Sequence, residues 1–114
     1  MSSDIASNFL IYLGFLLRDT DFRLYNRDLR VWISEYQCGT YTDLMVVKGE
    51  PEFNCVRNDE ILNPMLIVEV LSPSTEAYDR GDKFRKYRSI ASFCEYLLVS
   101  QTEPYIEQYH NAGW

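Results

Sequence analysis

The sequence predicts an α/β domain in which a central mixed sheet of about five strands is flanked by helices. Three observations predict this class: an amphipathic segment near the N-terminus, several short apolar segments of strand length, and a second helical segment late in the chain. The expected order is helix, three strands, helix and two strands. The chain has 114 residues, of which 46% are hydrophobic, so one core can be buried. The sequence shows no internal boundary, and we expect one domain over residues 1–114.

The first helix is predicted over residues 4–18. Its apolar residues recur mostly at spacings of three and four positions and form one stripe, made by Ile5, Phe9, Leu13, Leu16 and Leu17. Such a stripe is the face that a helix packs against the rest of a domain. Ser3 or Asp4 would cap its N-terminus.

The next three predicted elements are strands. Apolar residues occupy alternate positions in the second half of residues 22–34 and indicate the first strand. A turn is expected at residues 37–40, followed by a second strand at residues 41–47, whose apolar end is typical of a strand covered on both faces. A long polar connection over residues 48–64 then leads to the third strand at residues 66–71, which is apolar except for one glutamate.

The second helix, predicted over residues 79–89, concentrates positive charge in an acidic chain. The net charge is −6, which argues against a general nucleic-acid binder, since that class is usually basic. Five of the 11 basic residues nevertheless lie in this helix: Arg80, Lys83, Arg85, Lys86 and Arg88. A local stripe of this kind can meet phosphate although the whole domain is acidic. A fourth strand at residues 97–99 and a fifth at residues 105–110 complete the predicted sheet.

The cysteines and the single histidine argue against several kinds of site. Cys38, Cys55 and Cys94 are odd in number and lack the spacing of a zinc site, so we interpret them as reduced thiols. One histidine, His110, argues against a catalytic triad and against histidine-ligated zinc. No signal peptide is recognised, and the apolar stretch at residues 9–17 is too short to cross a membrane. We expect a cytoplasmic protein.

Glu69 is the most informative residue, because it interrupts the most apolar predicted strand. An ionised carboxylate in a dry interior is costly unless it is paired or bound to a cation. Three alternatives follow: Glu69 lies at the wet end of its strand, pairs with a buried Lys or Arg, or holds a cation. The residue alone does not decide between them.

Asp43 and the second helix supply companions for this glutamate. Asp43 precedes another apolar strand, and adjacent strands lie about 4.8 Å apart, so two carboxylates at matching heights can share an ion such as Mg²⁺. Asp79, Lys83 and Tyr87 are spaced by four and should share one helix face, where Lys83 would offset charge on a phosphate or orient a water. The alternative is a solvated helix with a surface Asp79–Lys83 pair. Carboxylates that hold a cation beside a lysine are what metal-assisted phosphodiester hydrolysis needs.

Three blocks of the chain resemble the Uma-two family, whose members are regarded as restriction endonucleases within the PD-(D/E)XK nuclease superfamily and are abundant in cyanobacteria. The blocks are residues 41–43 (Tyr-Thr-Asp), residues 67–75 (Ile-Val-Glu-Val-Leu-Ser-Pro-Ser-Thr) and residues 79–88 (Asp-Arg-Gly-Asp-Lys-Phe-Arg-Lys-Tyr-Arg). The second block followed by Asp-Arg-Gly-x-Lys-x-x-x-Tyr is specific, and the resemblance extends through almost the whole chain.

The resemblance implies a restriction-endonuclease-like core in which Asp43 and Glu69 are the acids of the motif and hold a divalent ion, Mg²⁺ or Mn²⁺. Lys83 matches a lysine of the following helix that replaces the lysine usual two positions after the second acid, where this chain has Leu71. Thr42 stands where the motif has proline. Family members extend further at both ends, so the chain is expected to be truncated at both ends.

We therefore expect a metal-dependent endonuclease acting on nucleic acid, with DNA as partner and a homodimer as one expected assembly. The candidate catalytic residues are Asp43, Glu69 and Lys83, the supporting residues are Asp79 and Tyr87, and the candidate backbone contacts are Arg80, Arg85, Lys86 and Arg88. The alternative for the last four is a solvated helix face. The alternative function is a catalytically inactive relic or interaction module that keeps the nuclease fold, which truncation favours and the intact acids and lysine oppose.

Overall fold

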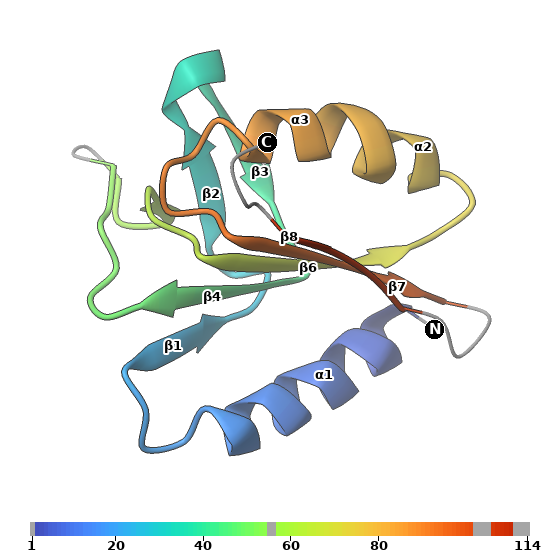
Figure 1. Cartoon of the computed structure of the whole chain (residues 1–114), viewed down its shortest axis with the longest axis horizontal. Helices are drawn as coiled ribbons and strands as arrows, with labels where there is room; N and C mark the ends of the chain where they lie inside the picture. Colours follow the sequence, from blue (N-terminus) through green and yellow to red (C-terminus); the bar gives the residue numbers. More distant parts are fainter. Residues whose placement is uncertain (1, 55–56, 102–105, 111–114) are drawn as a thin grey trace.

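The computed structural model describes residues 2–54, 57–101 and 106–110, and these residues form two sheets covered by helices (Figure 1). The larger sheet contains, in spatial order, β1 (Phe22–Tyr25), β4 (Leu44–Lys48), β6 (Leu66–Leu71), β7 (Glu95–Ser100) and β8 (Ile106–His110). β6 and β7 run parallel, whereas the other neighbouring pairs are antiparallel. The predicted mixed sheet of about five strands is confirmed.

A second sheet, which the sequence did not predict, is made of β2 (Arg30–Ile33), β3 (Cys38–Tyr41) and β5 (Glu60–Ile61) in the order β3-β2-β5. The single strand expected within residues 22–34 is therefore two strands, β1 and β2, in different sheets. An Asx turn separates them, in which the Asp28 amide donates to Asn26 Oδ1 at 3.0 Å. β3 occupies most of the predicted turn at residues 37–40, and β5 lies within the predicted connection.

Helices cover both faces of the larger sheet (Figure 1). α1 (Ser2–Leu16) lies on one face; the other is covered by a continuous helix made of α2 (Glu76–Tyr78), a π-helical turn η2 (Asp79–Lys83) and α3 (Phe84–Tyr87). A 3₁₀ turn, η1 (Ser34–Tyr36), joins β2 to β3. The predicted stripe of α1 is right for Ile5, Phe9 and Leu13, which pack on the sheet, but Leu16 is 51% exposed. The second helix begins at Glu76 rather than at residue 79, and its π-helical turn was not predicted.

Alternate residues of the central strands face two different cores. In β6, Ile67 and Leu71 belong to the core beneath α3, whereas Val68 packs with the residues of α1. Both faces of the strand are buried, which explains the apolar runs that marked these strands in the sequence. Glu69 alternates in step with Ile67 and Leu71, so its side chain points toward the α3 side.

Cys38 and Cys94 are free, as interpreted from the sequence, whereas Cys55 lies outside the described residues, as does Tyr105 of the predicted fifth strand. In the described part of the chain, none of the helices has the length and apolar character that a membrane span requires.

Candidate active site

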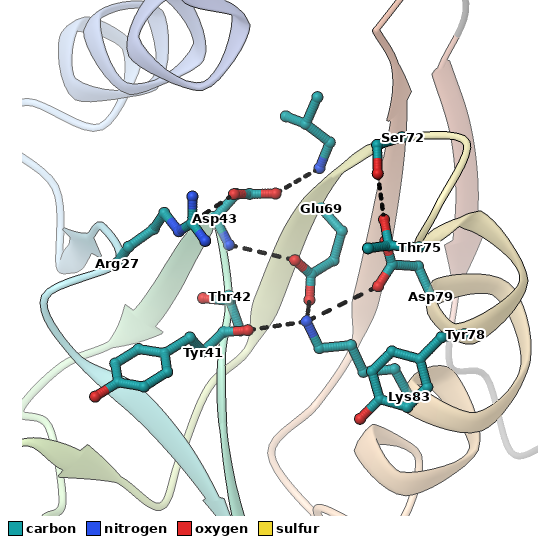
Figure 2. Close-up of a pocket in the computed structure, with 11 residues that line it drawn as sticks. Arg27, Tyr41, Thr42, Asp43, Glu69, Ser72, Thr75, Tyr78, Asp79 and Lys83 are labelled. Atoms are coloured by element: carbon teal, nitrogen blue, oxygen red, sulfur yellow. Dashed lines mark hydrogen bonds and ion pairs between the residues drawn. The ribbon is translucent and has the colours of Figure 1, made fainter. Parts of the chain in front are cut away.

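The pairing of β4 with β6 brings Asp43 beside Glu69. Leu44 pairs with Val68 in antiparallel register, so the residue before Leu44 stands opposite the residue after Val68. The Asp43 amide donates to Glu69 Oε1 at 3.3 Å, and the Val70 amide donates to Asp43 Oδ2 at 2.7 Å (Figure 2). The two carboxylates therefore stand at matching heights on adjacent strands, as predicted.

Lys83 reaches the same place from the π-helical turn (Figure 2). Its Nζ lies 2.6 Å from Glu69 Oε2 and 3.9 Å from Asp79 Oδ1, and it donates to the Tyr41 carbonyl at 2.9 Å. Asp79 is 4% exposed and Lys83 is 8% exposed, so the alternative of a solvated surface pair is wrong. Of the three alternatives for Glu69, the structure shows pairing with a buried lysine, and the binding of a cation stays a prediction.

Two tyrosines complete the hydrogen bonds of this cluster. Tyr87 OH donates to Glu69 Oε2 at 3.0 Å, so Tyr87 supports the glutamate directly. Tyr96 OH donates to the Asp79 carbonyl at 2.9 Å and ties the start of the π-helical turn to β7. Asp79, Lys83 and Tyr87 are all buried, which matches the prediction that they share one helix face.

Burial leaves the carboxylates of this cluster incompletely compensated. The pKa of Glu69 is raised from 4.5 to about 7, first because burial desolvates its charged form, and further because Asp43 and Asp79 are negative; Lys83 acts in the opposite direction. Burial also raises the pKa of Asp79, again against the effect of Lys83. One buried ammonium is therefore not enough to balance the negative charge that these side chains would carry.

A cavity of about 230 Å³ opens beside the cluster, and both acids and Lys83 line it. Its wall is formed by Arg27, Tyr41, Thr42, Asp43, Glu69, Val70, Ser72, Thr75, Tyr78, Asp79 and Lys83 (Figure 2). Two carboxylate oxygens have capacity for a further ligand: Asp43 Oδ1, which has Arg27 Nε at 3.7 Å, and Glu69 Oε1, whose bond from the Asp43 amide is long.

The donor set suits a hard cation that keeps part of its water shell. Mg²⁺ is often held by one or two carboxylates, with water and substrate phosphate as the other ligands. Within the described ranges, no three His, Cys, Asp or Glu side chains are grouped so as to hold a metal ion by themselves. Asp43 and Glu69 would thus supply two ligands, and the open side of the cavity leaves room for the rest.

The basic residues predicted as backbone contacts, Arg80, Arg85, Lys86 and Arg88, are not among the described residues that line the cavity. Their partners lie on the protein itself: Glu76 and Glu107 for Arg80, Asp82 for Arg85 and Lys86, and the Phe84 ring for Arg88. The stripe seen in the sequence is thus largely neutralised by neighbouring carboxylates. A role for these residues in binding nucleic acid stays a prediction.

Several cavity residues were missed as site residues by sequence reasoning. Arg27 follows the Asx residue of a turn that the sequence pattern merged into one strand, so nothing local pointed to it. Tyr41 begins the first motif block and Tyr78 directly precedes the third, but neither was singled out as a site residue. Thr42 stands out in the sequence only as a replacement for proline; its Oγ1 is buried and has no hydrogen-bond partner among the described residues.

The chain is similar to known proteins in sequence. Residues 2–113 match the model of the Uma2 family, described as "Putative restriction endonuclease". Two uncharacterized proteins of Synechocystis sp. are similar in sequence. The first, sll1609, is 38% identical over 95 residues, which are 83% of this chain and 54% of that protein. The second, slr1290, is 43% identical over 90 residues, 79% and 46% of the two chains. This chain thus spans about half the length of these relatives.

A solved structure shares the fold. The crystal structure of a protein from Anabaena variabilis, described as "a putative nuclease belonging to DUF820", superposes with a TM-score of 0.75 at 16% sequence identity. The match covers 99% of this chain and 64% of the other. The likeness extends over both sheets and the helices that position the cluster.

Proposed function

Because this chain belongs to the Uma2 family, described as "Putative restriction endonuclease", we propose that it is a metal-dependent nuclease that hydrolyses phosphodiester bonds. The observation that supports this most is that Asp43, Glu69 and Lys83, from separate parts of the chain, line one open cavity. In this proposal Asp43 and Glu69 hold Mg²⁺ or Mn²⁺. We propose DNA as the substrate, and formation of a homodimer stays a prediction.

The charge balance of the site supports a cation. Of the charged side chains described around the cavity, Asp43, Glu69 and Asp79 are acidic, whereas only Lys83 is a buried cation and Arg27 is 69% exposed. When bound, a divalent ion would polarise a phosphate oxygen and lower the pKa of a water molecule. Since proton loss from Glu69 must accompany ion binding, the affinity should rise with pH through the pKa of about 7.

The protein groups around the two acids fix their orientation. The Val70 amide holds Asp43 by one oxygen, and Tyr87 and Lys83 hold Glu69 by one oxygen, so each carboxylate keeps its other oxygen directed elsewhere. Lys83 is itself fixed by the Tyr41 carbonyl. An ammonium held in this way can stabilise negative charge that develops on a phosphate without reorganising during the reaction.

The proposal is tested by nicking of a supercoiled plasmid with Mg²⁺ or Mn²⁺, and with a chelator as the blank. We expect Asp43→Asn, Glu69→Gln and Lys83→Gln each to lower the rate by about 100-fold, because each removes a group that would bind the ion or stabilise charge. Lys48→Gln is the matched control, since Lys48 is exposed and does not line the cavity. Equal residual nicking in all variants would mean that the activity does not come from this site.

Thermal melting separates binding from turnover. Mg²⁺ should raise the Tm of the wild-type protein and leave that of Asp43→Asn unchanged, because a ligand that binds only the folded state stabilises it. A metal-dependent rise in Tm without any nicking would favour the alternative of an inactive module that keeps the fold.

A further inference from the structure

Two partly exposed tyrosine rings flank the candidate active site. Tyr41, at the end of β3, is 49% exposed, and Tyr78, at the end of α2, is 44% exposed, yet both line the cavity that contains Lys83. Figure 2 shows the Tyr78 ring beside Lys83, and the Tyr41 ring on the opposite side, where it extends outward from the backbone whose carbonyl faces the ammonium. Aromatic rings left accessible beside a phosphate-binding group are the surfaces on which unpaired bases stack.

The Tyr41 ring lies over the guanidinium of a partly buried ion pair. The Arg30 guanidinium lies 5.8 Å from the ring centroid, and Arg30 Nε donates to Glu60 Oε2 at 2.7 Å. Glu60 is 1% exposed and also accepts a hydrogen bond from Asn54 Nδ2 at 2.8 Å. A ring fixed in this way loses little conformational freedom when it contacts a ligand. Tyr78 lies next to the lysine, whose Nζ is 6.0 Å from its ring centroid.

The charge distribution does not favour an extended duplex contact. Binding of a duplex depends mainly on many cations that contact phosphates. In this acidic chain several arginines outside the cavity are already paired: Arg23 with Glu50, Arg57 with Asp59, Arg80 with Glu76 and Arg85 with Asp82. The cavity of about 230 Å³ is also smaller than the roughly 300–1,000 Å³ of typical ligand pockets, so it would take one unit of a polymer.

We propose that the cavity takes an unpaired nucleotide, with its base against Tyr41 or Tyr78 and its phosphate at Lys83, so that the substrate is single-stranded or locally unpaired nucleic acid. The inference rests on the proposed nuclease function and names its substrate class. In a duplex the base faces are covered by their neighbours, and exposing one has an energetic cost that this acidic chain does not offset with phosphate contacts. A single strand presents its base faces without that cost.

The test is fluorescence anisotropy with a labelled single-stranded DNA, the RNA of the same sequence and the corresponding DNA duplex, with Ca²⁺ in place of Mg²⁺. Either single strand should bind at least about tenfold more tightly than the duplex. Tyr41→Leu and Tyr78→Leu should each weaken single-strand binding about fivefold or more, whereas Tyr41→Phe and Tyr78→Phe keep the ring and the affinity. Tyr12→Leu is the matched control, because Tyr12 is 60% exposed on α1, outside the cavity.

A second probe makes the result independent of whether the leucine variants fold. A single-stranded DNA with abasic positions removes the bases instead of the rings, and wild-type protein should bind it about fivefold or more weakly than intact single-stranded DNA. Duplex binding as tight as single-strand binding, or phenylalanine variants as weak as leucine variants, would overturn the inference.

The inference and the proposed function fail separately. Metal-dependent nicking that needs Asp43 but is insensitive to both ring substitutions would refute the inference alone. Ring-dependent binding of single strands without any metal-dependent hydrolysis would refute the nuclease proposal alone.

Discussion

Glu69 receives donors from three segments of the chain: the Asp43 amide before β4, Lys83 in η2 and Tyr87 in α3. These contacts fix the position of the carboxylate but do not balance its charge, because burial and the neighbouring acids raise its pKa to about 7. A side chain whose position is fixed by hydrogen bonds but whose charge is incompletely balanced is typical of a functional site.

The raised pKa of Glu69 predicts how its removal affects stability. Because the pKa rises from 4.5 to about 7 on folding, protonated Glu69 stabilises the fold below pH 4.5, and this contribution is lost as pH rises through 7. Glu69→Gln, which resembles the protonated form, should change the metal-free protein little at about pH 5 and raise its free energy of unfolding by roughly 1–3 kcal/mol at about pH 8.

Urea denaturation with a chelator at the two pH values measures this difference. Glu35→Gln, at an exposed position, is the matched control and should have no effect at either pH. A loss of stability at both pH values would show instead that the Lys83–Glu69 pair contributes to the fold, since removing one partner of such a pair leaves a buried charge.

Single residues differed in how far the sequence predicted them. Asp43 and Glu69 were predictable because Asp43 precedes an apolar strand and Glu69 interrupts one. A carboxylate at such a position is costly unless it is paired or bound to a cation. Arg27 was not predictable, because its approach to Asp43 depends on a turn between strands of different sheets. Tyr41 and Tyr78 were not predictable, because their partial exposure beside Lys83 depends on the tertiary structure and not on the local sequence.

Among the elements, the second sheet positions the segment that carries Asp43. β3 ends at Tyr41, whose carbonyl accepts a hydrogen bond from Lys83, and Asp43 follows two residues later, after Thr42. The buried Glu60 of β5 ties this sheet together through Arg30 of β2. The second sheet therefore positions both Asp43 and Tyr41 at the cavity.

Gly39 in β3 allows this ion pair to approach the strand. A Cβ at this position would lie 2.7 Å from Arg30 Nε and 2.8 Å from Glu60 Oε2, so the pair would have to move. We expect Gly39→Ala to lower the free energy of unfolding by about 1–2 kcal/mol, because overpacking displaces a buried salt bridge. Thermal or urea denaturation checks this.

Gly14 provides the contrasting substitution. It lies in α1, and a Cβ added there would meet nothing within 4 Å, so Gly14→Ala should leave stability unchanged or raise it by up to about 1 kcal/mol. An equal loss in both variants would contradict a specific role for Gly39.

Elements whose pattern is local were predicted well. β6 was predicted with its observed bounds, because an apolar run of six residues between polar segments has few other interpretations. The second sheet was not, because assigning a strand to a sheet depends on distant pairing, and β5 is a two-residue strand that begins with a buried glutamate. The π-helical turn was not, because α and π turns share the same side-chain pattern over so short a segment.

For the whole molecule, the order of helices and central strands was predictable, but the distribution of charge was not. The sequence showed a cluster of cations after Asp79; the structure pairs several of them with Glu76, Asp82 and Glu107. Partners far apart in the chain, such as Arg80 and Glu107, can be found only once β8 is placed beside the helix.

The salt dependence of DNA binding tests whether the four basic residues of the helix, Arg80, Arg85, Lys86 and Arg88, contact phosphate. If only Lys83 and Arg27 contact phosphate, log K for single-stranded DNA should fall against log salt with a slope of about −1.4, at roughly −0.7 per phosphate. If the four basic residues of the helix also contact phosphate, the slope should be about −4. Anisotropy over a salt series measures it, and Arg85→Gln should leave the shallow slope unchanged.

Because alternate residues of β6 face different cores, the position of Glu69 along the strand decides which core its side chain faces. Glu69 meets Lys83 because it lies two positions after Ile67, an even step that keeps both side chains on the same face of the sheet. Gain or loss of one residue between Leu66 and Val68 would turn the glutamate toward α1 and present an aliphatic side chain to the lysine. Insertions and deletions in this family should therefore occur in the loops. The interior of the strand should tolerate substitutions, but not the insertion or deletion of a single residue.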